Sequence, residues 1–279
     1  MPIDELPMER CAPEDAQPRK LVRSYPSYHQ LGVRVNAVQI TDVIEIVEEW
    51  IACHSGAQYI AVTGMHGMTE AYRDPDFKRV LNQAGLVVPD GMPLVWLARY
   101  HGFKLKRRVY GPELMLKFCE ATAQKGYRHF FYGGGEGIAR LLETALKRRF
   151  PHLVVAGTYT PPFRPLTPQE ETEIVDVLAQ AQPDILWVGL STPKQEKWMH
   201  AHRHLPVPAM IGVGAAFDLN AGRLKQAPEW LQEHGLEWFF RLLVEPRRLW
   251  RRYLLQGPKF VFYVLLELSG LRKYDSPAC

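Results

Sequence analysis

The stretch VVPDGMPLVW, residues 87–96, sets one aspartate, Asp90, between two apolar runs. The run before it indicates a buried strand, and the run after it, which starts near Pro93, indicates a helix. An ionised carboxylate avoids apolar surroundings unless it is paired or hydrogen-bonded. Helix capping is the simpler explanation from the residues alone, although Pro93 at the first helical position would make Met92 the cap and leave Asp90 two residues early. As a general base it would gain basicity from its apolar neighbours.

The strand-then-helix pattern around Asp90 repeats along most of the chain. Apolar strands that alternate with helices are typical of a parallel sheet covered on both faces, so we predict an α/β fold with a Rossmann-like sheet. Ligands bind such sheets at the carboxyl ends of the strands, where Asp90, Thr63 and Gly189 fall. Strands are predicted at 33–38, 59–63, 86–88, 129–133, 153–159, 185–189 and 209–213, and helices near 41–53, 66–73, 75–84, 93–101, 112–125, 136–149, 168–181 and 193–203.

The chain divides into segments that differ in pattern. Residues 1–30 are polar and interrupted by prolines, which is typical of a mobile N-terminal arm. Residues 31–227 carry the α/β pattern and form the predicted Rossmann-like catalytic domain. Residues 228–279 read as helices that start with prolines, and we predict a helical, basic, membrane-proximal appendage there.

The basic charge of the chain is concentrated in that appendage. Residues 241–252 hold five arginines and one glutamate, a net charge of +4 that equals the formal charge of all 279 residues. Arg241, Arg248 and Arg251 have helical spacing, although Pro246 interrupts the helix. Either a solvated helix face or a clamp for a diphosphate would explain them, because guanidinium groups fit phosphate oxygens well.

The cysteines and the apolar runs bear on location. Four scattered cysteines without a C-x-x-C pair argue against a zinc ribbon or a disulfide framework and suit the reducing cytoplasm. Acidic residues interrupt the N-terminus, so no secretory signal is expected. The apolar run at 260–268 is too short to cross a bilayer of ~30 Å, and it fits either a buried terminal helix or a helix lying on a membrane.

Glycines mark a second candidate site in YGGGEG, residues 132–137, between a strand and a helix. Gly133, Gly134 and Gly135 form either a phosphate-binding loop or a plain tight turn, since glycines let backbone amides approach an anion closely. The G-x-G-x-x-G pattern fails at Ile138, and no acidic residue ends the next strand, so an NAD site is disfavoured.

Two groups resemble metal sites but have simpler explanations. The D-x-D match at Asp74 and Asp76 is also a complete helix start, with Asp74 as cap and Pro75 at the first position. The three histidines in residues 200–204 lack the H-E-x-x-H arrangement of a zinc site and are attributed to a solvated helix end. We predict no bound metal.

Taken together, the motifs resemble the bacterial glycosyltransferases of the WecG/TagA/CpsF family from about residue 33 to residue 255. Each motif is weak by itself, whereas their joint order is specific. The matching segments are VTGMHGMTEAYRDPDF, NQAGLVVPDGMPLVWLAR, RRVYGPELM, FFYGGGEGIA, PDILWVGLSTPKQEKW and IGVGAAFDLNAGRLKQAPEWLQEHGLEWFFRLLVEPRRLWRRYL.

The resemblance implies transfer of a sugar from a UDP-sugar, with inversion and without a metal or other cofactor, to a polyprenyl-diphosphate-linked saccharide in cell-surface polysaccharide synthesis. It implies a cytoplasmic enzyme in peripheral contact with the inner face of the bacterial cell membrane, and no nucleic-acid partner. The donor stays open between N-acetylmannosamine, its uronic acid, glucose and glucuronic acid, because Met65, with His66 adjacent, and Glu113 depart from the family pattern. A homo-oligomer is compatible with the sequence.

Site residues follow from the resemblance position by position. Asp90 matches the proposed general base, which takes the proton of the acceptor hydroxyl. Charge on the leaving UDP would be met by amides of the glycine turn and by arginines. The other matches are Thr63 lining the pocket, Arg108 near the active site, Gln195 facing the sugar, Asp218 contacting the nucleotide, and Arg241, Arg248 and Arg251 in the appendage.

Other functional classes are compatible with parts of the pattern. A nucleotide-dependent Rossmann enzyme of another class, such as a dehydrogenase, would use the same sheet edge and would show bound nicotinamide spectroscopically. A protein that binds nucleic acid or anionic lipid would use the arginine run, and its nucleic-acid affinity would fall steeply with salt. The order of the motifs favours the glycosyltransferase.

Overall fold

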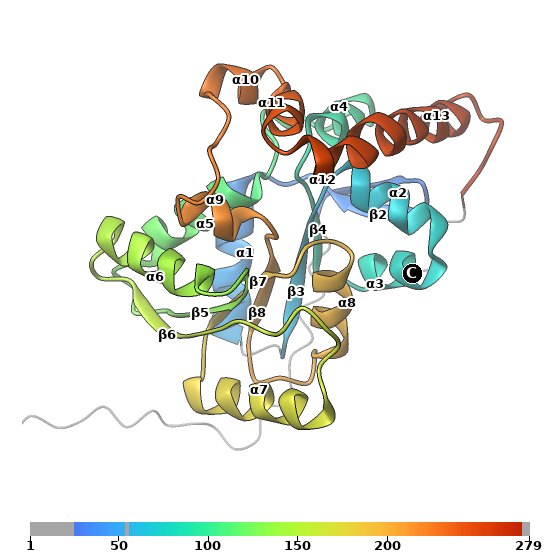
Figure 1. Ribbon diagram of the computed structural model, residues 1–279. Helices are drawn as coiled ribbons and strands as arrows, with labels where there is room; N and C mark the ends of the chain where they lie inside the picture. The colour runs from blue at the N-terminus through green and yellow to red at the C-terminus, as the bar shows by residue number, and fades with distance from the viewer. Residues whose placement is uncertain (1–24, 54–55, 275–279) are drawn as a thin grey trace, which may run out of the picture.

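The centre of the protein is a parallel sheet, seen in a computed structural model that describes residues 25–53 and 56–274 (Figure 1). Six strands lie in the order β4-β3-β8-β7-β5-β6, and every neighbouring pair is parallel. The predicted α/β fold is therefore confirmed. The strands are β3 (Gln58–Thr63), β4 (Leu86–Pro89), β5 (Arg128–Gly133), β6 (Val154–Tyr159), β7 (Ile185–Gly189) and β8 (Ala209–Gly212).

Helices cover both faces of this sheet because its strands carry apolar side chains on both sides. Neighbours on one strand, such as Phe130 and Phe131, point into two different hydrophobic cores. One core includes α3, α7 and α8, and the other includes α1, α5 and α6. These helices span α1 (Ile40–Cys53), α3 (Pro75–Asn82), α5 (Gly111–Thr122), α6 (Ile138–Arg149), α7 (Pro168–Ala181) and α8 (Lys194–Ala201).

The first predicted strand does not join the parallel sheet. Instead β2 (Val33–Asn36) pairs antiparallel with β1 (Ser27–Gln30) in a separate two-stranded sheet. Leu31 and Gly32 join the two strands, both with positive φ, 54° and 77°. Positive φ at both central residues is the turn geometry that matches the twist of a tight hairpin.

The hairpin also corrects the predicted N-terminal arm. Residues 27–30 were expected to be mobile, but Tyr28 and Gln30 are buried. The Tyr28 hydroxyl donates to the Leu94 carbonyl at 2.6 Å, and the Gln30 amide donates to Glu267 of the C-terminal helix. The rest of the predicted arm up to residue 24 lies outside the described residues.

The C-terminal helices lie beyond the carboxyl ends of the strands, near α2 (Met65–Arg73) and α4 (Met92–Tyr100) (Figure 1). The sequence indicates one helix after Pro228, but the structure has two, because the chain turns at Gly235, whose φ is 72°. These elements are α10 (Glu229–Glu233), α11 (Glu237–Val244), α12 (Pro246–Trp250), the π-helix η1 (Arg251–Gln256) and α13 (Gly257–Leu268).

Helix α13 carries the apolar run that was predicted to be buried or to lie on a membrane. Its Phe260 and Val264 are buried, and Tyr263 stacks on Tyr72 of α2 with 4.0 Å between ring centroids. Its other face leaves Phe262 and Leu265 more than half exposed, at 57% and 59%. Within residues 25–53 and 56–274, no helix has both the length and the apolar character needed to cross a membrane.

Candidate active site

Asp90 directly follows β4, an outer strand of the six-stranded sheet, and lies at the carboxyl ends of the strands. Its backbone N–H donates to the Thr63 carbonyl at 2.8 Å, which ties the ends of β4 and β3 together. It does not cap the helix that follows, because Gly91 occupies the cap position of α4. Instead the Asp90 carboxylate accepts the N–H of Gly111, the first residue of α5, at 3.3 Å. The positive end of that helix therefore faces the carboxylate.

The surroundings of Asp90 make it a stronger base than an ordinary aspartate. Burial raises the pKa of Asp90 from 3.8 to about 6, the nearby Arg108 guanidinium opposes this shift, and the Glu237 carboxylate adds to it. A carboxylate with a pKa near 6 is mostly ionised at neutral pH and binds a proton more tightly than an ordinary aspartate does. Both properties suit a general base.

Arg108 connects the Asp90 loop to the C-terminal helices, close to the site as the sequence predicts. Its guanidinium forms an ion pair with Glu237 of α11, and both side chains are largely buried. It also lies over the Tyr110 ring, 4.1 Å from the centroid, and donates to the Asp90 carbonyl at 3.4 Å. Helix α11 is thus held beside Asp90 by a pair that replaces water around both charges.

A cavity of about 370 Å³ opens above Asp90 and is roofed by the C-terminal helices. The arginines that the sequence singled out come from α11, α12 and η1, and all of them reach this cavity despite the break at Pro246. The polar and charged side chains that line the cavity include Asp90, His66, Tyr110, Gln195, Arg241, Arg248, Arg251 and Arg252.

Arg252 is a site residue that the sequence analysis missed. It lines the cavity above Asp90 and a smaller one of about 100 Å³ on the side of Met92 and Trp238. Burial lowers the pKa of Arg252, whereas the nearby Asp90 and Tyr253 act to raise it. The sequence analysis chose Arg251, three residues after Arg248, although Arg252 at four residues also has helical spacing. In the structure both belong to η1 and both line the cavity.

A further cavity, of about 580 Å³, adjoins the first and shares Ser191, Gly214 and Arg248 with it. Gly134, Gly135 and Asp218, which the sequence assigns to the nucleotide, lie in its wall. Asp218 belongs to α9 (Ala216–Asn220), a short helix that the sequence analysis did not predict. Gly134, Gly135 and Asp218 thus line a cavity that adjoins the one containing Asp90, and Arg248 lines both.

The glycine turn itself has a structural explanation in part. Gly133 has a φ of 119°, and a Cβ there would lie 2.7 Å from backbone atoms of Gly189. The Gly134 N–H donates to the Gly189 carbonyl at 3.0 Å, so this amide does not face a ligand. The requirement for glycine at these two positions is therefore steric, and Gly133 lines neither cavity.

Gln195, which was predicted to face the sugar, is buried and lines the cavity above Asp90. Its Nε2 donates to Glu196 at 3.1 Å, and within the described part of the chain its Oε1 has no hydrogen-bond partner. Glu196 also accepts the Thr192 hydroxyl at 2.7 Å, and burial raises the pKa of its carboxyl group. Glu196, which the sequence analysis missed, thus fixes the Gln195 amide with its oxygen free to accept a hydrogen bond.

Thr63 was predicted to line the pocket, but it lines none of these cavities. Its side chain is buried beneath α2, where a Cβ on Gly67 would lie 2.0 Å from the Thr63 hydroxyl oxygen. Only the backbone carbonyl of Thr63 contacts the site, where it accepts the N–H of Asp90.

His66, which follows the departure from the family pattern at Met65, connects α2 to the π-helix. Its Nδ1 lies 2.5 Å from Oε1 of Gln256, and Nε2 of Gln256 donates to Glu70 at 2.9 Å. Burial lowers the pKa of His66, which favours its neutral form at neutral pH. The appendage is therefore tied to α2 by the hydrogen bonds of Gln256 as well as by the Arg108–Glu237 pair.

The predicted helix start at Asp74 is confirmed. Its carboxylate accepts the N–H groups of Asp76 and Phe77 at 3.0 and 3.1 Å and pairs with Lys197 at 2.7 Å. Among the histidines of residues 200–204, His202 is buried against Trp198, so the expectation of a solvated helix end is wrong for this residue. Across residues 25–53 and 56–274, no cluster of three or more His, Cys, Asp or Glu side chains could hold a metal ion.

The fold and the site define an α/β protein that gathers a basic carboxylate and four arginines at the carboxyl edge of a parallel sheet. Such an arrangement suits transfer chemistry in which an alcohol is deprotonated and an anionic group departs. The chain belongs to the Glycosyl transferase WecG/TagA/CpsF family, which matches residues 28–274. It is a glycosyltransferase.

Relatives in this family carry specific names. The chain is 35% identical over 197 residues to the N-acetylglucosaminyldiphosphoundecaprenol N-acetyl-beta-D-mannosaminyltransferase of Bacillus spizizenii, covering 70% of this chain and 74% of the relative. The protein of the same name from Bacillus subtilis is 33% identical over 205 residues, 73% and 77% of the two chains. Its namesake from Staphylococcus aureus is 26% identical over 248 residues, 87% and 94% of the two chains.

Proposed function

We propose that the protein transfers N-acetylmannosamine from its UDP-linked form to a polyprenyl-diphosphate-linked N-acetylglucosamine, with inversion at the anomeric carbon. The names of the relatives supply the sugar and the acceptor. The observation that carries the proposal is the convergence of Asp90 with Arg241, Arg248, Arg251 and Arg252 in one cavity.

Asp90 acts as the general base in this proposal. Its carboxylate takes the proton from a hydroxyl of the acceptor sugar, and the oxygen forms a bond to the anomeric carbon of the donor. The bond from that carbon to the β-phosphate oxygen breaks, and its electron pair leaves with UDP. A single in-line displacement inverts the anomeric carbon, so an α-linked donor gives the β-linked product in the relatives' names.

The departing UDP gains negative charge on its diphosphate, and this charge must be neutralised as it develops. We assign this role to Arg241, Arg248, Arg251 and Arg252, which the C-terminal helices bring to the cavity. Arg248 also lines the adjoining cavity with Gly135 and Asp218, where we place the nucleoside. The buried Gln195 Oε1 is positioned to accept a hydrogen bond from the donor sugar, since Glu196 holds the other end of the amide.

Contact with a membrane surface brings the enzyme to its lipid-linked acceptor. The C-terminal helices expose apolar side chains together with Arg247 and Lys259, a combination that suits the interface of a membrane with anionic lipids. We therefore place the enzyme on the inner face of the cell membrane. The exposed apolar side chains of the appendage include Trp238, Phe239, Leu243, Val244, Leu254, Leu255, Val261, Phe262, Leu265 and Leu268.

The proposal is tested with purified full-length enzyme, a short-chain lipid-diphosphate N-acetylglucosamine, and a panel of UDP-sugars assayed with and without a chelator. UDP-N-acetylmannosamine should be the preferred donor, and the product should be β-linked by NMR. Arg248→Ala should lower kcat/KM for the donor at least ~10-fold, because a charge-assisted contact to phosphate is lost. The matched control is Arg247→Ala, an exposed neighbour that does not line the cavity. Equal losses in both variants, or clear preference for another donor, would contradict the proposal.

A further inference from the structure

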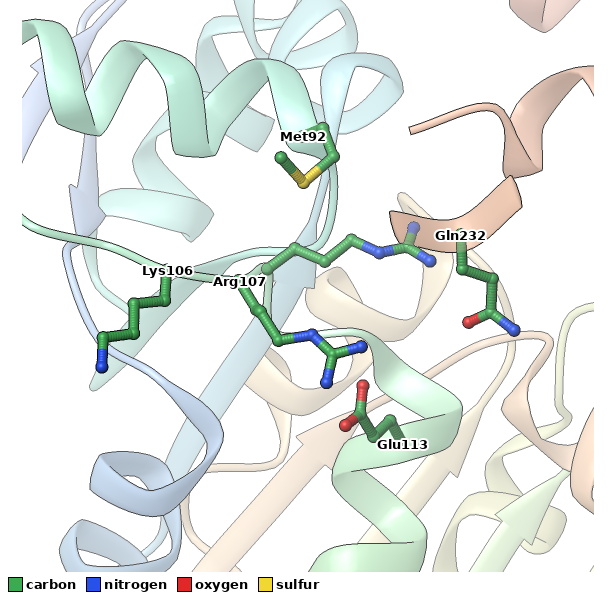
Figure 2. Close-up of a pocket in the computed structure, with 6 residues that line it drawn as sticks. Met92, Lys106, Arg107, Glu113 and Gln232 are labelled. Atoms are coloured by element: carbon green, nitrogen blue, oxygen red, sulfur yellow. The ribbon is translucent and has the colours of Figure 1, made fainter. Parts of the chain in front are cut away.

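A separate basic cavity of about 310 Å³ lies next to the active site (Figure 2). Lys106, Arg107 and Arg108 line it together with Glu113, Met92 and Gln232. The three cations are consecutive and follow α4 in a loop, residues 101–110, that contains four basic residues and no acidic one. The nucleotide cavities described above use none of Lys106, Arg107 or Glu113.

This basic cavity is connected to Asp90 through shared walls. Arg108 and Met92 line it and also line the cavity of about 100 Å³ that contains Asp90 and Trp238. Arg108 also donates to the Asp90 carbonyl at 3.4 Å, so the wall that the two cavities share touches the Asp90 backbone. The donor cavity of about 370 Å³, in contrast, is lined by Asp90 together with Gln195, and neither Lys106 nor Arg107 lines it.

The charges in the cavity suit a dianion that arrives from solvent. Glu237 neutralises Arg108, and the Arg107 guanidinium points toward Glu113 (Figure 2). Lys106 and Arg107 are both exposed residues. Two cations at the mouth of a cavity can hold two phosphate groups, with Arg107 offering a planar fork of donors and Lys106 a point charge.

Apolar side chains accompany this basic cavity. Its walls include Met92 of α4 and Gln232 of α10, and these helices expose Trp96 and Tyr100, and Trp230, respectively. The turn after α10 packs on α4, since a Cβ on Gly235 would lie 3.2 Å from Met92. A basic cavity joined to exposed aromatic residues matches a ligand with an anionic head and a hydrocarbon chain.

We propose that Lys106 and Arg107 bind the diphosphate of the lipid-linked acceptor. The acceptor sugar then extends past Arg108 to Asp90, and the hydrocarbon chain leaves over Trp96, Tyr100 and Trp230. This inference rests on the proposed function. It also explains how one active site can accept two diphosphates. The diphosphate of the donor contacts the appendage arginines, and the diphosphate of the acceptor contacts the loop of residues 101–110. This separation reduces the repulsion between the two negative groups.

The experiment compares two acceptors that carry the same sugar and the same short alkyl chain, one through a diphosphate and one through a simple glycosidic oxygen. Lys106→Ala/Arg107→Ala should lower the preference for the diphosphate acceptor at least ~10-fold and raise its KM, while the KM for the donor stays within about twofold. Lys106→Ala alone, which leaves Arg107 and Glu113 in place, should give a smaller change in the same direction. Lys104→Ala is the control, because Lys104 is exposed on the same loop but does not line the cavity.

Direct binding of the diphosphate acceptor, measured by calorimetry without donor, should weaken at least ~10-fold in the double variant whether or not transfer occurs. Loss of transfer to both acceptors in equal proportion would overturn the inference, because it indicates a structural role. So would unchanged acceptor binding combined with weaker binding to vesicles of anionic lipid, which would make the loop a membrane contact. Failure of the proposed function appears differently, as absence of transfer by the wild-type enzyme.

Discussion

Replacing Asp90 by asparagine should abolish most of the activity and also stabilise the protein at neutral pH. The amide has the shape of the protonated acid, and its oxygen can still accept the Gly111 N–H that the carboxylate accepts at 3.3 Å. It cannot take a proton from the acceptor hydroxyl. We therefore expect kcat to fall at least ~10²-fold, with the affinity for UDP little changed because the appendage arginines remain.

The size of the stability effect follows from the environment of the carboxylate. A pKa raised from 3.8 to about 6 means that ionised Asp90 costs ~3 kcal/mol in the folded protein, since each pKa unit corresponds to ~1.4 kcal/mol. Asp90 faces an open cavity, where water screens part of this cost, and we expect ~1–2 kcal/mol to be measurable.

The sign of the pH dependence distinguishes this effect from a general change in stability. Between pH 4 and 6 the folded wild type retains a proton on Asp90 that the unfolded chain has released, so this residue lowers the free energy of unfolding as pH rises. The Asp90→Asn variant lacks this contribution. The two proteins should be equally stable near pH 4, and the variant should be the more stable above about pH 6.

Urea denaturation from pH 4 to 8, followed by circular dichroism, measures the difference between the two proteins. Asp176→Asn serves as the control, because Asp176 is exposed on α7 at the far end of the sheet (Figure 1). A stability difference that does not change with pH would refute the assigned environment of Asp90. An active Asp90→Asn enzyme would refute its role as the base.

The remaining predictions concern the contacts around the site. In the wild type, kcat should fall as the pH drops through about 6, because Asp90 takes up a proton there. Glu237→Gln should move this fall in kcat to lower pH, because the Glu237 carboxylate raises the pKa of Asp90. The same variant should lower the free energy of unfolding by ~1.5–3 kcal/mol, because the ion pair with Arg108 is lost. A pH–rate profile and a urea titration test both effects, and a fall in kcat at unchanged pH would contradict the coupling. Tyr263→Ala removes the ring stacked on Tyr72 at 4.0 Å and should lower stability by at least ~1 kcal/mol, whereas Val261→Ala on the exposed face of the same helix should have little effect on thermal melting. Gly133→Ala should lower the free energy of unfolding by at least ~3 kcal/mol, because a Cβ would lie 2.7 Å from the Gly189 backbone at a φ of 119°. Gly126→Ala is the control, since its φ is 72° and the space around a Cβ is open, and it should lower the free energy of unfolding by only ~1 kcal/mol. Equal losses in the two variants would show that crowding at Gly133 is unimportant.

Local patterns in the sequence predicted most of the architecture. Strands such as 185–189 are apolar throughout and alternate with helices, and this periodicity is a property of neighbouring residues that needs no knowledge of distant ones. The cap at Asp74 could be predicted for the same reason, since its hydrogen bonds reach only two and three residues ahead. The hairpin was missed because its first strand has only four residues, too few for the alternation to stand out.

Amino-acid order alone also placed Asp90 at a strand end and the arginines in one run, because both statements concern position along the chain. Only the tertiary structure could place Glu237 on Arg108, 129 residues away, bring Arg252 into the cavity through a π-helical turn, and turn the Thr63 side chain under α2. The basicity of a carboxylate depends on the charges near it and on how much water is excluded from it. Both depend on distances in space between residues far apart in the chain, and the local hydrophobic periodicity of the sequence does not contain that information.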